Sequence, residues 1–138
     1  MIEAEEKKVG IISCSGEKCV EGTISRIATR LVLAKLRPNE TVTICLPLFL
    51  AGGKEEREFA RDYPTITVDG CDKTCAKLAT KRYSGKPASS IVITDLMKNW
   101  QCANLNSRRE LNDETLNVTR KVADRIVEEV DEVLKHRV

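Results

Sequence analysis

The sequence predicts an α/β fold, and within that class a small doubly wound (Rossmann-like) three-layer sandwich around a mostly parallel four-stranded sheet. Short β-branched segments alternate along the chain with longer segments of helical period. Parallel strands need crossover connections, which are usually helices. The length of 138 residues also fits one domain. We therefore expect a single domain over 1–138, with a cysteine-bearing core at 9–97, an irregular connection at 98–112 and a C-terminal helix at 113–136.

Four short segments rich in valine, isoleucine and threonine are predicted to be the strands. They cover residues 9–13, 41–46, 65–68 and 90–94. Turns that contain glycine follow the first and third segments, and Pro47 is expected to end the pairing of the second.

Four segments of helical period are expected between and after these strands. They cover residues 23–36, 54–63, 72–83 and 113–136. Thr23 can cap the first helix, which should end before Pro38, and Pro64 follows the second. The last helix should be capped by Asn112 or Asp113, because both residue types favour that position.

Composition and charge exclude several classes of partner. Lysine and arginine number 23 against 21 acidic residues, and their interspersion leaves no basic stripe for nucleic acid. No apolar stretch approaches the ~20 residues needed to cross a membrane. The charged first residues, 1–8, lack an apolar signal segment, so we expect a cytoplasmic protein. No feature of the sequence identifies a protein partner.

Six cysteines in a cytoplasmic chain call for an explanation other than structural disulfides. Cys14 follows the first predicted strand, Cys45 lies near the end of the second, and Cys71 follows the third, with Cys75 one helical turn later. The carboxyl ends of parallel strands share one edge, where doubly wound folds bind ligands. We therefore expect these four cysteines to meet at that edge.

Four sulfur atoms at one edge would suit Zn²⁺, which is commonly held by thiolates in tetrahedral sites. A helix start at Cys71 and Cys75 would offer free N–H groups that favour thiolate over thiol. Cys45 could equally be a small core residue, which would leave three ligands and an open position. Cys19 could be a spare ligand, a resolving thiol or a residue without a role, and Cys102 is interpreted as incidental unless its loop folds over the site.

Three other polar residues have alternative interpretations. Asp69 could cap the following helix, or could hydrogen-bond to a metal ligand or transfer a proton. Asp95 is expected to be a helix cap. His136, close to the chain end, is expected to be exposed and to have no metal role.

Two stretches of the chain form a distinctive pattern. They are Asp69-Gly70-Cys71-Asp72-Lys73-Thr74-Cys75-Ala76-Lys77 and Ile91-Val92-Ile93-Thr94-Asp95-Leu96. Together with the Cys14-Ser15-Gly16 turn and the Cys45-Leu46 pair, this pattern resembles the DGC-domain family, to which zinc binding is attributed. The resemblance covers most of the chain from Val9 to Leu96. It implies a metal site at Cys14, Cys45, Cys71 and Cys75 but no known reaction.

The leading functional hypothesis is a zinc-binding protein that holds, delivers or senses the metal. An alternative is a thiol redox or thiol-transfer enzyme with Cys71 as nucleophile and a second cysteine as resolving thiol. Another is an iron–sulfur protein. A phosphatase loop would need an arginine six positions after Cys14, where Val20 stands. The sequence assigns no catalytic residue, so whether the protein is an enzyme stays open.

Overall fold

A single parallel sheet forms the centre of the protein, in a computed structural model that describes residues 8–14, 19–98, 100 and 112–136. Its strands are β1 (Val9–Ser13), β2 (Thr41–Val42), β3 (Thr65–Asp69) and β4 (Ser89–Val92). All neighbours pair in parallel, in the order β2-β1-β3-β4. The chain runs outward from β1 to β2 and then returns past β1 to β3. The winding direction therefore reverses between β1 and β3, as in doubly wound sheets.

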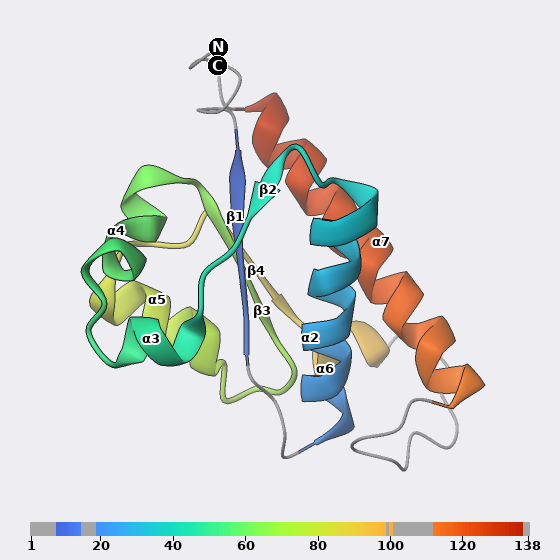
Figure 1. Ribbon diagram of the computed structural model, residues 1–138. Coiled ribbons are helices and arrows are strands. Elements are labelled where there is room, and N and C mark those ends of the chain that lie inside the picture. The colour runs from blue at the N-terminus through green and yellow to red at the C-terminus, as the bar shows by residue number, and fades with distance from the viewer. Residues whose placement is uncertain (1–7, 15–18, 99, 101–111, 137–138) are drawn as a thin grey trace.

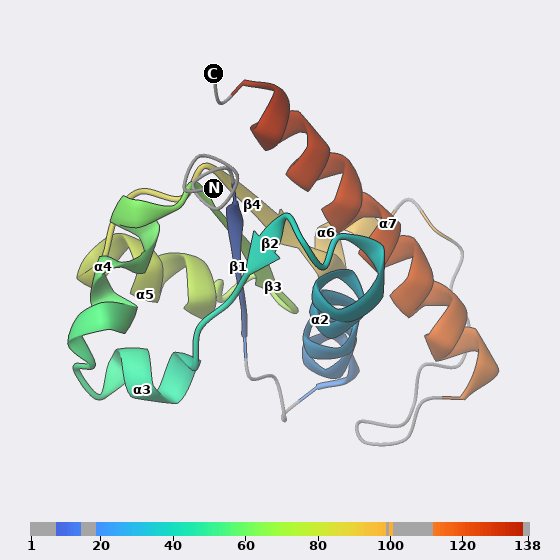
Figure 2. The same ribbon diagram turned by 45° about the horizontal axis from the view of Figure 1, so that its top comes forward.

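Helices cover both faces of this sheet and confirm the α/β class (Figure 1). They are α2 (Val20–Leu31), which continues as the π-helical segment η1 (Val32–Leu36), and then α3 (Leu46–Leu50), α4 (Lys54–Asp62), α5 (Cys75–Tyr83), α6 (Ile93–Met97) and α7 (Asp113–Lys135). Helices α3, α4 and α5 lie on one side, whereas α2 and α7 lie together on the other (Figures 1 and 2). None of the described helices combines the length and apolar character that crossing a bilayer requires.

Alternation along the strands divides the apolar core between the two faces. Val9 and Ile11 of β1 pack in the larger cluster with α2 and α7, whereas Ile12 faces Phe59 and Ala76 in the smaller one. Cys14, two residues after Ile12, packs against the smaller cluster. The first cysteine of the chain therefore contacts the cluster beneath α4 and α5, while its Sγ also lies 3.2 Å from Ser25 Oγ of α2.

Two of the predicted strands are shorter than expected. The second predicted strand, 41–46, pairs only at Thr41–Val42, and Pro47 lies in the first turn of α3. Proline suits that position, because the first amides of a helix have no partner within it. The fourth strand likewise ends at Val92 and the chain turns directly into α6. The strand prediction was wrong at these ends because β-branched composition does not show where pairing stops.

The helix starts also differ from the predictions. The first helix begins at Val20 with Cys19 as its N-cap, so Thr23 lies buried inside it rather than at its cap. The third predicted helix, 72–83, begins only at Cys75. Asn112 caps α7 as expected and accepts a hydrogen bond from the Thr115 amide at 2.8 Å. The predicted irregular connection falls largely on 99 and 101–111, outside the described residues.

Arg37 joins the end of η1 to α7 through a two-point ion pair. Its Nε donates to Asp131 Oδ1 at 3.0 Å, and its Nη2 donates to Oδ2 at 2.9 Å. These hydrogen bonds lower the pKa of Asp131 below its ordinary value of 3.8. A carboxyl group with a lower pKa in the folded state adds stability above its unfolded pKa, and loses that contribution as the pH falls through the folded value.

We expect Asp131→Asn to destabilise the fold at pH 7, and the difference from wild type to disappear as the pH falls through the lowered pKa of Asp131, because the wild-type carboxyl group then becomes protonated as well. The effect should be small, because the Asp131 side chain is 51% exposed and water screens the pair. Urea unfolding of both proteins at each pH measures it. Asp124→Asn, an exposed change on the same helix, is the control. A stability difference that stayed constant with pH would contradict the expectation.

Candidate functional site

The strands lead into helices at the carboxyl edge of the sheet (Figure 1), and the five cysteines of the described residues all lie in these connections or at the helix starts. Cys14 directly follows β1, Cys71 follows β3 by two residues, and Cys75 is the first residue of α5. Cys19 and Cys45 are the N-caps of α2 and α3. All five are free thiols. The sixth cysteine, Cys102, lies outside the described residues.

Cys14 lies at the point where the strand order reverses, next to the turn that contains Cys71. Its Sγ accepts a hydrogen bond from the Gly70 amide at 3.3 Å and lies 3.2 Å from Ser25 Oγ. Because Ser25 Oγ donates its proton to Gly22 O at 2.6 Å, the thiol must be the donor toward Ser25. Burial raises the pKa of Cys14, which also favours the protonated thiol.

Asp69 forms the link between β3 and α5. Its Oδ1 accepts a hydrogen bond from the Ala76 amide at 2.7 Å, and its Oδ2 accepts one from the Lys77 amide at 3.1 Å. The side chain is buried, and this burial raises the pKa of Asp69 although both amides and the Lys77 charge act in the opposite direction. Of the alternatives left open by the sequence, the structure shows the capping role.

Gly70 brings the end of β3 against the start of α2. A Cβ atom at this position would lie 2.6 Å from Gly22 N and 2.8 Å from Glu21 C, both of them backbone atoms. The Gly70 carbonyl also accepts a hydrogen bond from the Thr94 amide in α6 at 3.2 Å. The turn after β3 therefore contacts α2, α5 and α6 and lies beside Cys14.

The structure brings some of the predicted ligands closer together than others. Cys14 and the Gly70-Cys71 turn are in direct contact, whereas Cys45 and Cys75 are exposed at the same edge. Within residues 8–14, 19–98, 100 and 112–136, no three or more histidine, cysteine or acidic side chains form a group that could hold a metal ion. The sequence did not indicate Ser25 as a neighbour of Cys14, because only the packing of α2 brings them together.

A family model, the DGC domain, matches residues 10–133. The chain belongs to the DGC domain family. The match includes the Asp69-Gly70-Cys71 turn and confirms the resemblance seen in the sequence. No curated protein and no solved structure matches the chain.

Two other polar residues of the chain, Asp95 and His136, have structural partners. Asp95 is inside the first turn of α6, not at its cap, and pairs with Lys98 at 3.3 Å. The capping prediction for Asp95 was therefore wrong, because the helix starts earlier than expected. His136 is exposed as predicted, and its Nε2 lies 2.8 Å from Glu132 Oε1.

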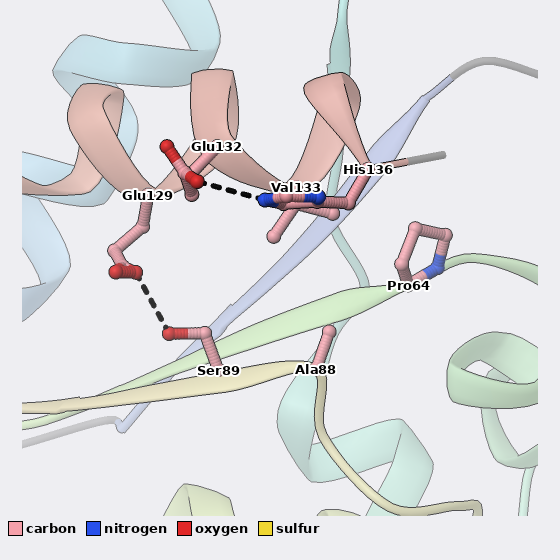
Figure 3. A pocket seen from close by; sticks show the side chains of 7 residues that line it. All are labelled: Pro64, Ala88, Ser89, Glu129, Glu132, Val133 and His136. Carbon is pink, nitrogen blue, oxygen red and sulfur yellow. Dashed lines mark hydrogen bonds and ion pairs between the residues drawn. The ribbon is translucent and has the colours of Figure 1, made fainter. Parts of the chain in front are cut away.

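The DGC domain also has a cavity of about 480 Å³ at the opposite end of the sheet (Figure 3). It is lined by Pro64, Ala88, Ser89, Glu129, Glu132, Val133 and His136. Ser89 Oγ donates to Glu129 Oε2 at 3.0 Å, and the imidazole of His136 faces Glu132. These polar groups pair with one another, and the cavity contains no cysteine.

Proposed function

We propose that this DGC domain protein binds zinc through Cys14, Cys45, Cys71 and Cys75 and acts in holding, delivering or sensing the metal. One observation carries the proposal: cysteines from three separate strand-to-helix connections lie at the edge where the winding of the sheet reverses. Doubly wound folds bind their ligands at this position. We further propose that the protein acts in the cytoplasm, where thiols stay reduced and available to a metal.

The chemistry of the donors fits zinc, since four thiolates form a common structural zinc set. Binding would require the exposed Cys45 and Cys75 to move toward Cys14 and Cys71, and neither exposed thiol is enclosed by packing. The Cys14 thiol would have to give up the proton that it shares with Ser25. Zinc affinity should therefore increase with pH, because metal and proton compete for the sulfur.

The thiol redox alternative receives less support from the contacts at the start of α5. This alternative expected the Cys71 thiolate at a helix start, stabilised by free amides of the first turn, but α5 begins only at Cys75. The amides of Ala76 and Lys77 instead donate to Asp69. The contact between Cys14 and the Gly70-Cys71 turn would also suit two cysteines that bind one metal ion, and that function needs no activated nucleophile.

We expect one zinc ion per chain after purification without added metal, and its loss in Cys71→Ser and Cys75→Ser. The reason is that serine replaces a strong thiolate ligand by a hydroxyl group, which is not among the usual ligands of zinc. Elemental analysis measures the metal, and Cys102→Ser, a change at the cysteine interpreted as incidental, is the control. Cys14→Ser that keeps full metal content would remove the first-strand ligand from the proposal.

The same preparation separates the other two functions. A brown protein that contains iron would establish a cluster in place of zinc. Metal-free protein that forms a reversible disulfide between Cys71 and Cys75, or between Cys71 and Cys14, would favour thiol redox chemistry instead.

A further inference from the structure

The start of α5 depends on a capping group from another element. Its own N-cap residue, Thr74, makes no side-chain capping hydrogen bond. The two amides that follow Cys75 are instead satisfied by the carboxylate of Asp69, which is the last residue of β3. A local cap would hold only the helix, whereas a cap from the sheet also fixes where the helix begins relative to the strand.

The Asp69 contacts enclose the segment that contains both cysteines. Cys71 comes two residues after Asp69, and Cys75 directly precedes Ala76, whose amide donates to the Asp69 carboxylate. This hydrogen bond therefore closes a loop around the two cysteines. Because Asp69 is only 2% exposed, water does not readily replace it at the helix start.

The backbone inside this loop is in an unfavourable conformation. Thr74 has φ of 49°, in the left-handed region that β-branched residues rarely adopt. The surrounding contacts must therefore hold it, since such a conformation persists only where neighbouring structure imposes it. The Thr74 amide donates to Cys71 O at 3.2 Å, and the Asp69 bonds hold the helix immediately after it.

We propose that Asp69 is a positioning residue for the Cys71–Cys75 pair, because it holds the start of α5 against the end of β3 so that both sulfurs face the carboxyl edge. This role rests on the zinc function proposed above. It assigns separate tasks to the residues of the Asp69-Gly70-Cys71 turn: Asp69 fixes α5, Gly70 allows the close approach of α2, and Cys71 supplies the sulfur.

The test is the zinc affinity of the metal-free chain of 138 residues, measured by competition with a chromophoric chelator, for wild type and Asp69→Ala. We expect the affinity to fall by about 10-fold to 100-fold, the range found when groups that orient metal ligands are removed. Asp69→Asn keeps one acceptor oxygen for the two amides and should lie between wild type and Asp69→Ala. If Asp69→Ala does not fold, the test is made with Asp69→Asn alone. A zinc affinity equal to that of wild type in the folded variant would overturn the positioning role of Asp69.

Asn112→Ala is a matched control, because it also removes a helix cap but acts on α7. It should reduce the stability of the fold in the same way while changing zinc affinity by less than about twofold, as expected for separate sites. Equal affinity losses in the two cap variants would show a general stability effect and overturn the positioning role. Wild-type protein that binds no zinc would overturn the proposed function, and the positioning role with it.

Discussion

Replacing Gly70 with alanine is expected to lower the free energy of unfolding by about 3 kcal/mol, the upper part of the usual range for overpacking. The new Cβ would meet backbone atoms of α2, the closest being Gly22 N at 2.6 Å. Backbone atoms within a helix cannot rotate away as the end of a side chain can. Either β3 or α2 must move, which would also disturb the hydrogen bond from the Gly70 amide to Cys14 Sγ. Urea unfolding followed by circular dichroism measures the loss.

Gly85→Ala provides the comparison for this substitution. A Cβ at Gly85 would lie 3.5 Å from Ala60 O, an ordinary contact, and Gly85 is not among the glycines of positive φ. We expect a change between zero and about 0.5 kcal/mol in favour of the folded state, because alanine restricts the unfolded chain. Similar losses at both glycines would show that the approach of α2 to the end of β3 is not the constraint at Gly70.

The alternation of strands and helices was enough to predict the α/β class and the edge at which the cysteines lie. This works because parallel strands joined by helices all present their carboxyl ends on the same side. Local composition was not enough to predict α3 and α6, which have only five residues each. Such short helices depend on packing, and apolar residues such as Leu46 fit a buried strand equally well.

At the candidate site, too, the sequence pattern predicted some features, whereas others depend on how the helices pack. The Asp69-Gly70-Cys71 turn and its family could be identified from the sequence. The partners of Asp69 could not, because whether a carboxylate caps a helix depends on where that helix begins. The sequence predicted a helix from residue 72. In such a helix the Ala76 and Lys77 amides would donate to carbonyl groups of the preceding turn, not to Asp69. The left-handed conformation of Thr74 delays the helix to Cys75 and exposes these amides to the carboxylate.

Phe49→Ala is expected to lower the free energy of unfolding by about 4 kcal/mol, because truncation of a buried aromatic residue leaves a cavity. Phe49 is the one fully buried residue of α3, and its ring packs edge-on against Tyr83 of α5 with 6.2 Å between ring centroids. This contact fixes α3 to the helix that begins with Cys75. Loss of it should therefore also weaken zinc binding if Cys45, at the start of α3, is a ligand as proposed.

Leu48→Ala on the same helix separates packing from helix propensity. Leu48 is 48% exposed, so its truncation should change stability by less than about 0.5 kcal/mol. Urea unfolding and a zinc titration of both variants give the comparison. A small effect of Phe49→Ala, close to that of Leu48→Ala, would mean that α3 is not held to α5 through this ring. A large loss of stability with unchanged zinc affinity would instead remove Cys45 from the ligand set, and would leave three cysteines and an open coordination position.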